Sequence, residues 1–175
     1  MKAQTPRLLL RPFEPSDAAG FLALNADPEV LKHTGDQPFR DLAHARAFIL
    51  AYDHYKRHGF GRWSVLAKDD DRYMGFCGLR RSESSGDVDL GFRLMRAFWG
   101  RGYATEAANK ALELGFEAFG LKRIIARAVP DNKASLRVLQ KLHMSPCGMQ
   151  LEGTQRWLVH ELTLDAWKTL SSHGK

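Results

Sequence analysis

The sequence has few cysteines and no long hydrophobic run, and each shortage excludes a class of protein. Its two cysteines, Cys77 and Cys147, stand far apart and form no CxxC pair, which excludes a disulfide-dense scaffold and favours two free thiols. No apolar stretch approaches the roughly 20 residues that cross a bilayer, and the opening residues lack the hydrophobic segment of a signal peptide. We therefore expect a cytoplasmic protein without membrane contact.

Familiar metal and nucleophile motifs are also missing. Seven histidines are present, but none belongs to an HExxH pair, and there is no GxSxG elbow and no Walker loop. His54 and His58 share one face of an expected helix at i, i+4, yet no third ligand is in view, so we interpret them as paired surface histidines. No metal site is expected. The basic residues are spread along the chain without a dense run, so direct nucleic-acid binding is not expected either.

The composition that is present is typical of a globular protein. The 175 residues are 44% hydrophobic and 26% charged, which suffices for one domain with a substantial core. No linker or repeat interrupts the sequence, so we expect residues 1–175 to form this single domain. The net charge of +6 would help to attract an anionic cofactor or partner.

Hydrophobic periodicity and turn residues predict both strands and helices. The predicted strands cover residues 8–13, 63–68, 73–79, 88–94, 123–129, 147–151 and 156–164. The predicted helices cover residues 16–26 with Ser16 as the cap, 41–58 with Asp41 as the cap, 103–119, 134–142 and, as one turn or more, 165–170. This order is a mixed α/β pattern with antiparallel strands in the middle.

The junction between the strand at 88–94 and the helix at 103–119 is the most informative feature of the chain. Residues 98–105 read FWGRGYAT, and the small residues among them let the backbone pass close to a bulky group. The start of the helix leaves its first N–H groups unpaired, at the positive end of the helix dipole. The junction therefore suits an anion, and a pyrophosphate fits best. A tight turn whose glycines only relieve strain is the alternative interpretation.

The amino-acid sequence of this junction resembles that of a known family. The run FWGRGYATEA is similar to the acyl-CoA-binding loop of the GNAT superfamily of N-acetyltransferases, and most similar to the RimJ/RimL-like branch. Gly102 and Ala104 fit the small positions of that loop, whereas Trp99 stands where Gln or Arg is usual. The runs TPRLLLRPFEPSD, MGFCGL, VDLGFRL and VPDNKASLRVLQKL look like the same branch. The resemblance implies an α/β fold with a mixed, largely antiparallel, splayed sheet of about seven strands and about four helices.

The resemblance implies acetyl-CoA as the co-substrate and assigns it to two segments. Backbone N–H groups from Arg101 to Thr105 would hold the pyrophosphate, and Arg101 would add a charged donor. Asn132, which is otherwise a good helix N-cap, would hydrogen-bond the pantetheine arm, and Ser135 would approach the sulfur. The expected cofactor-binding residues are Phe92, Arg93, Leu94, Trp99, Gly100, Arg101, Gly102, Tyr103, Ala104, Thr105, Asn132 and Ser135.

The strand at 88–94 has a special place in the implied mechanism. GNAT sheets splay beside it, and its amides would pair with the pantetheine arm as a further strand does. A backbone N–H between Phe92 and Leu94 would polarise the thioester carbonyl. Gly91 would permit a close approach or a bulge in this strand.

The chemistry implied is direct attack of a free amine, from which a base must take a proton. Asp89 matches a carboxylate of this branch and is the preferred base, with a solvated strand residue as the alternative. Glu106 is the rival, although the helix dipole favours a first-turn glutamate in any case. Because no tyrosine follows Tyr103, Ser135 or water would have to protonate the leaving thiolate. His143 replaces a glycine that commonly closes the second cofactor helix, and we expect a structural consequence.

The function implied is transfer of an acetyl group to a primary amine. Acceptors in this branch include the N-terminal amines of proteins, ribosomal proteins among them, and the basic chain mildly suits an acidic or ribosome-bound acceptor. Two alternatives stay open: a small-molecule amine acetyltransferase for detoxification or resistance, and an acyl-CoA-binding sensor without turnover. A monomer or a homodimer is expected.

Overall fold

One twisted sheet of eight strands organises the computed structural model, which describes residues 1–173. The spatial order is β1-β2-β3-β4-β5-β6-β8-β7, and all neighbours are antiparallel except β5 and β6. The strands are β1 (Ala3–Gln4), β2 (Leu8–Arg11), β3 (Arg62–Ala67), β4 (Tyr73–Arg81), β5 (Val88–Leu94), β6 (Arg123–Ala128), β7 (Ser145–Glu152) and β8 (Gln155–Thr163). The mixed, largely antiparallel sheet is confirmed, with one strand more than expected. Strand β1 is only two residues long and therefore leaves no periodic pattern in the sequence.

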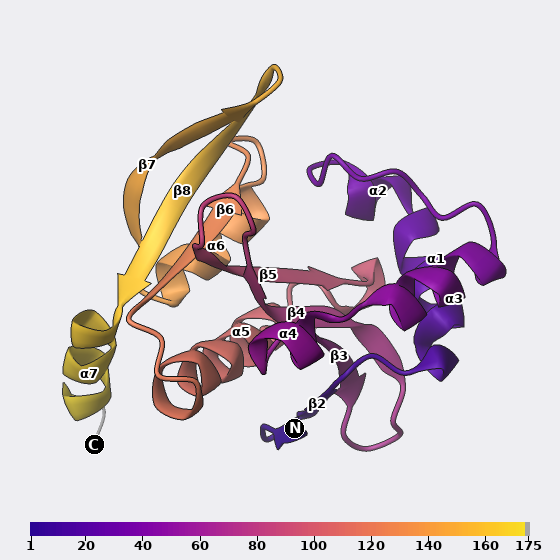
Figure 1. The fold of residues 1–175 in the computed structure, drawn as a ribbon, viewed down its shortest axis with the longest axis horizontal. Helices are drawn as coiled ribbons and strands as arrows, with labels where there is room; N and C mark the ends of the chain where they lie inside the picture. The colour runs from indigo at the N-terminus through magenta and orange to yellow at the C-terminus, as the bar shows by residue number, and fades with distance from the viewer. Residues whose placement is uncertain (174–175) are drawn as a thin grey trace.

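Helices cover both faces of the sheet (Figure 1). They are α1 (Ala18–Ala26), α2 (Pro28–Leu31), α3 (Leu42–Ala51), α4 (His54–His58), α5 (Tyr103–Glu113), α6 (Lys133–Lys141) and α7 (Leu164–His173). Helices α5 and α6 pack into the large hydrophobic cluster of the sheet, whereas α1 and α3 build a smaller cluster around Phe21 and Ile49. The sheet thus separates a large core from a small one. Within the described residues, no helix is long and apolar enough to cross a membrane.

The sheet splays between β5 and β6. These parallel strands pair at two positions, Asp89 with Ile125 and Leu90 with Ala126. Beyond Leu90, β5 continues to pair with β4 as far as Leu94, while β6 turns toward β8. Figure 1 shows the two strands leaving in different directions, with the β7–β8 hairpin following β6. The second half of β5 therefore has a strand partner on one side only, as the resemblance implied.

Two of the expected helix boundaries on the N-terminal side are wrong, and one cap is confirmed. Ser16 does not cap a helix, because residues Pro15–Asp17 form a 3₁₀ turn whose capping box joins Glu14 and Asp17. Asp41 does cap α3, with its Oδ1 accepting the His44 N–H at 2.7 Å. The helix expected to continue to residue 58 breaks at Tyr52, which is extended. The Tyr52 hydroxyl there accepts the backbone N–H of Arg62 at 2.8 Å.

The structure also corrects two further expectations, one for the helix at 103–119 and one for His54. The helix that starts at Tyr103 changes to a π-helical turn over Leu114–Ala118, where Gly115 packs against Ile124 and Leu79 and leaves no room for a Cβ. The C-terminal helix α7 is longer than one turn. His54 is not a surface residue, since it is 8% exposed and its Nε2 accepts the Arg81 N–H at 2.9 Å. Both cysteines are free, as expected.

A buried ion pair ties the first helical turn to the sheet. Arg11 in β2 forms two hydrogen bonds of 2.8 Å with Asp17, and the Ser64 hydroxyl donates to the same carboxylate at 2.6 Å. Burial opposes ionisation of Asp17, but the hydrogen bonds from Arg11, Ser64 and the backbone of Glu14 outweigh it and lower the pKa of the carboxyl. This network fixes where α1 begins over the sheet.

We expect Asp17→Asn to lower the free energy of unfolding by about 3 kcal/mol at pH 7, because it leaves a buried arginine without its partner. A lowered native pKa stabilises the fold above the ordinary aspartate value of about 3.9, and this stabilisation is lost as the pH falls through the native pKa. The difference between the two proteins should therefore shrink in acid. Urea unfolding of both proteins at pH 7 and in acid measures this difference in the free energy of unfolding.

The matched control is Asp70→Asn, in the exposed turn between β3 and β4. It should change the free energy of unfolding by less than about 0.5 kcal/mol. Equal effects of the two substitutions at pH 7 would contradict a stabilising role for the Asp17 network.

Candidate active site

The junction after β5 has the geometry of an anion site. Gly100 and Gly102 have φ values of 71° and 79°, in the left-handed region that glycine adopts without strain. Gly102 is the N-cap of α5, and the first helical bond runs from Glu106 N–H to the Gly102 carbonyl at 3.0 Å. The N–H groups of Tyr103, Ala104 and Thr105 precede this bond and have no partner within the helix. A Cβ would meet nothing within 4 Å at Gly100, so the surface above the junction is open.

Cationic and aromatic side chains surround this junction. The Arg7 guanidinium lies 4.2 Å from the centre of the Tyr103 ring, and the Arg101 guanidinium lies 5.2 Å from it. Arg7 also donates to the Arg101 carbonyl at 3.0 Å. The Trp99 indole N–H donates to the Leu94 carbonyl at 2.7 Å and so fixes the path from β5 into the junction. Sequence analysis missed Arg7, because no local pattern shows that β2 begins beside the start of α5.

Glu106 is engaged in contacts that fix the fold. It accepts hydrogen bonds from the Thr5 hydroxyl at 2.6 Å, from the Arg7 N–H at 3.0 Å and from Arg7 Nε at 2.6 Å. Burial works against the charged form, but these donors outweigh burial and lower the pKa of the Glu106 carboxyl. The carboxylate therefore joins the N-terminal segment to the start of α5 through its contacts with Thr5 and Arg7.

The second expected cofactor segment lies beyond β6. Asn132 caps α6, with its Oδ1 accepting the Ser135 N–H at 3.1 Å. Both residues are partly exposed, and α6 packs against α5 and β6. At the other end of α6, His143 has a φ of 57°. It thus adopts the left-handed conformation that a glycine would take more easily, which is the structural consequence expected of this substitution.

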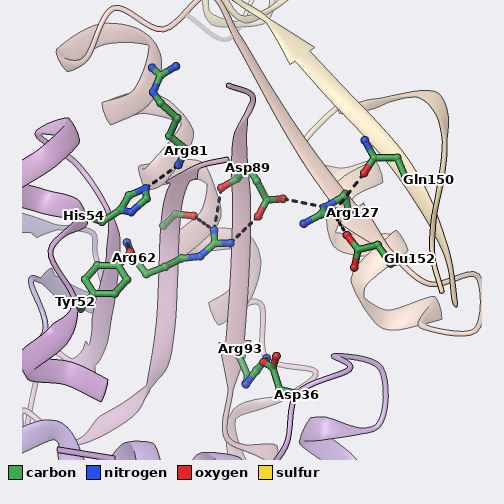
Figure 2. A network of polar contacts seen from close by, with 11 residues as sticks. Asp36, Tyr52, His54, Arg62, Arg81, Asp89, Arg93, Arg127, Gln150 and Glu152 are labelled. Atoms are coloured by element: carbon green, nitrogen blue, oxygen red, sulfur yellow. Dashed lines mark hydrogen bonds and ion pairs between the residues drawn. The ribbon is translucent and has the colours of Figure 1, made fainter. Parts of the chain in front are cut away.

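A line of ion pairs crosses the base of the splay (Figure 2). Asp89 of β5 is its centre: Oδ2 lies 2.6 Å from Arg62 Nη2, and Oδ1 lies 3.9 Å from Arg127 Nε. Arg127 in turn pairs with Glu152 of the β7–β8 hairpin at 2.6 Å. The side chains of Asp89 and Arg62 are each 13% exposed. The base of the splay is therefore spanned by alternating charges from β3, β5, β6 and β7.

Gly91 makes room for this line. A Cβ at position 91 would collide with the Arg62 guanidinium, which also donates to the carbonyls of Gly78 and Asp89. The register of β4 with β5 is regular past Gly91, so the bulge that we considered is absent, and the group that approaches Gly91 closely is the Arg62 side chain. The backbone of Arg62 is held in place by two tyrosines: its N–H donates to the Tyr52 hydroxyl, and its carbonyl accepts from the Tyr55 hydroxyl.

The remaining predicted residues of β5 have different surroundings. The Arg93 side chain lies on the same face as Asp89 and binds Asn25 and Asp36 from the N-terminal helical region. Phe92 packs against the large core on the other face, and Leu94 is buried there. What β5 leaves without a strand partner toward β6 after Leu90 is thus its backbone.

A cavity of about 150 Å³ opens beside Asp89. The turn between β4 and β5 and the β7–β8 hairpin form its walls. Its lining consists of Arg80, Ser82, Ser84, Ser85, Asp87, Asp89, Ile125, Arg127, Gln150 and Glu152. Sequence reasoning found only Asp89 among these, because the other side chains are brought together by sheet pairing. No cluster of three His, Cys, Asp or Glu residues suited to a metal occurs in the part of the chain that the structure describes.

Comparisons with known proteins agree with this geometry. The model of the acetyltransferase (GNAT) domain matches residues 7–145. The chain is 34% identical over 147 residues to an uncharacterized N-acetyltransferase, p20, of Bacillus licheniformis, covering 83% of each chain. Its fold is similar to that of a GNAT-family acetyltransferase from Bacillus anthracis, with a TM-score of 0.81, 24% identity and coverage of 94% of this chain and 99% of that one.

A further solved structure is the ribosomal-protein-S5-alanine acetyltransferase of Vibrio fischeri. It has a TM-score of 0.74 and 18% identity, with coverage of 95% of this chain and 98% of that one. At these identities the two solved structures show the fold alone. The family model and the sequence relative go further, and they agree with the splayed sheet and the glycine-rich helix start: the chain is a member of the GNAT family of acetyltransferases.

Proposed function

We propose that the protein transfers the acetyl group of acetyl-CoA to the N-terminal amine of a protein, in the manner of the RimJ/RimL-like branch. The observation that carries this proposal is the early end of the β5–β6 pairing at Leu90, followed along the same segment by the open helix start at Gly102. One edge of β5 and the unpaired amides of α5 thus lie in continuous sequence. A cytoplasmic location and the choice between monomer and homodimer stay predictions.

The chain offers groups that fit acetyl-CoA, which supplies a thioester carbonyl open to attack by an amine. The N–H groups from Arg101 to Thr105 suit its pyrophosphate, since an added Cβ at Gly100 would fill open space and Arg7 and Arg101 add positive charge. The free edge of β5 from Phe92 to Leu94 suits the amide-bearing arm. The Asn132 side chain adds a further donor. Its Oδ1 already accepts the Ser135 N–H in the helix cap, which leaves its N–H₂ group available on the other side of the splay.

Asp89 is our candidate for the group that receives the amine proton. Its Oδ2 is bound to Arg62, whereas Oδ1 has only the distant contact with Arg127, and the residue lines the cavity. The arginines keep the carboxylate in place, and the cavity gives the proton a route to solvent. Glu106 is a weaker candidate, because Thr5 and Arg7 already occupy its oxygens. Ser135, at the start of α6, or water would protonate the departing thiolate.

A protein N-terminus suits the open surroundings of this site. Every residue of β7 is exposed, and the cavity opens between this hairpin and the β4–β5 turn, so an extended chain could approach without a lid to move. The Vibrio fischeri neighbour is described as acting on an alanine of ribosomal protein S5. These two observations favour a peptide amine over a small amine.

The deciding experiment is release of free CoA thiol from acetyl-CoA in the presence of peptides and of small amines. We expect turnover with peptides that have a free N-terminus and none with the same peptides blocked at that amine. Turnover with small amines alone would replace the peptide acceptor by a small-molecule one. If the protein binds acetyl-CoA tightly but releases no CoA thiol with any of the amines, it is a sensor, and the enzyme proposal is refuted.

We expect Gly102→Glu to weaken acetyl-CoA binding at least about 100-fold by calorimetry, because a side chain and a negative charge would stand at the helix start where the pyrophosphate is held. The matched control is Gly120→Glu. Gly120 also has a positive φ, and an added Cβ there would meet nothing within 4 Å, so the control carries the same backbone strain and the same added charge. An unchanged affinity in Gly102→Glu, or an equal loss in both variants, would remove this placement of the pyrophosphate.

We expect Asp89→Asn to lower kcat at least about 100-fold, the usual contribution of a positioned general base, while the affinity for acetyl-CoA changes less than about twofold. The remaining rate should rise with pH up to the pKa of the acceptor amine, because only amine molecules already deprotonated by water can react. Initial rates over a pH series measure this. A pH–rate profile equal to that of the unmodified protein would exclude Asp89 as the base.

A further inference from the structure

We propose that Arg80 binds a carboxylate on the acceptor, so that the preferred protein N-terminus has an acidic side chain within its first two residues. This inference rests on the proposed function and deepens it. It concerns the cavity beside Asp89, whose side chains other than Asp89 have no role in the proposed transfer of the acetyl group.

Arg80 is placed for this role by the sheet register. It stands directly opposite Asp89 in the antiparallel pair of β4 and β5, and side chains opposite one another in such a pair lie on the same face about 5 Å apart. Both residues line the cavity, and Arg80 is exposed. A group bound to Arg80 would therefore lie next to an amine that transfers its proton to Asp89.

The charges of the cavity leave Arg80 as the cation without a partner. Its three carboxylates all have arginine partners: Asp87 pairs with Arg123 at 2.9 Å, Asp89 with Arg62 at 2.6 Å and Glu152 with Arg127 at 2.6 Å. Within the described residues, no hydrogen bond or ion pair is formed by the Arg80 guanidinium. Asp89 is bound by Arg62 from β3 although Arg80 is its direct neighbour across the strands.

Hydroxyl groups next to Arg80 would complete a site for an anion. Ser82 and Ser84 lie with their Oγ atoms 3.1 Å apart, and Ser82 Oγ accepts the Ser85 N–H at 3.3 Å. Hydroxyls can rotate to donate to a carboxylate oxygen. A volume of about 150 Å³ corresponds to about five water molecules of about 30 Å³ each, which is enough for a carboxylate and its last carbon.

The balance of charge favours a carboxylate over a phosphate. One unpaired guanidinium matches a single negative charge and offers it two parallel hydrogen bonds. A doubly charged group would stand beside the carboxylates of Asp87, Asp89 and Glu152, and the other arginine that lines the cavity, Arg127, is already paired with Glu152. We infer an acidic peptide, in which the carboxylate comes from a glutamate or aspartate side chain. The α-carboxylate of a free amino acid offers the same chemistry and is separated from it by experiment.

The test compares kcat/KM, by CoA release, for two peptides that differ only at the second residue, Ala-Glu and Ala-Gln at the N-terminus. We expect the unmodified protein to prefer the glutamate peptide about tenfold, as a charge-assisted hydrogen bond allows. In Arg80→Gln the ratio should fall to within about twofold of unity, and Arg80→Lys should give an intermediate ratio because it keeps the charge and loses the fork. The same assay compares free alanine with alaninamide, which tests whether the carboxylate that is bound comes from a free amino acid.

Arg46→Gln is the matched control, since Arg46 is an exposed arginine of α3 that does not line the cavity. Its preference for the glutamate peptide should equal that of the unmodified protein. Equal kcat/KM for the two peptides in the unmodified protein, or an undiminished ratio in Arg80→Gln, would overturn the role of Arg80 and leave the acetyltransferase proposal standing. A preference shown only for alanine over alaninamide would overturn the acidic peptide in favour of an amino acid. If no amine is acetylated while acetyl-CoA binds, both proposals fail.

Discussion

The parallel ladder between β5 and β6 ends after two residue pairs, and the rest of the site depends on this short ladder. A parallel pair that continued would have consumed the edge of β5 from Gly91 to Leu94 and closed the sheet. Because the strands separate, backbone donors and acceptors stay free in the middle of a sheet whose other strands shield them. An extended ligand can then complete the pairing as an additional strand does. The open edge leads directly into Gly100 and Gly102, so that one continuous segment supplies both strand amides and helix-start amides.

An open position in a sheet must be supported, and the line from Arg62 through Asp89 to Arg127 supplies that support at its base. Arg62 is fixed from both sides: the hydroxyls of Tyr52 and Tyr55 bind its backbone, and Gly91 leaves space for its guanidinium. Arg127 extends the line to Glu152 on the hairpin. The side chains of Arg62 and Asp89 are largely shielded from water, where an ion pair is screened less than at an exposed surface, whereas Glu152 at the end of the line is exposed. The same contacts that hold β5 and β6 at a set distance also orient the carboxylate that we propose as the base, so structure and chemistry share these residues.

Local features of this site could be predicted from the sequence, and features made by distant segments could not. Gly102 at a helix start, the caps at Asp41 and Asn132 and the extent of β5 depend on neighbours within a few residues, and the structure has them. The partners of Asp89 depend on sheet register, which places Gly78 between Arg62 and Gly91. The break at Tyr52 likewise depends on a hydrogen bond to β3. Such contacts between distant segments leave no periodic pattern in the sequence. Asp17 shows the same limit, because a first-turn aspartate and a buried partner of Arg11 look alike until the strands are in place.

The two sides of the splay are built from different materials, and this has a consequence for specificity. The side toward α5 uses backbone amides, which a substitution changes little, whereas the side toward the hairpin uses charged side chains. Cofactor geometry can therefore stay constant while the acceptor surface varies, as expected when a function is grafted on a common fold. The ion pairs on the charged side also become stronger when an acceptor occupies the cavity. The same pair of charges interacts roughly four times more strongly at an effective dielectric constant of about 20 than in bulk water. An acceptor that displaces water from the cavity would thus tighten the contacts around Asp89 at the moment when its amine must lose a proton.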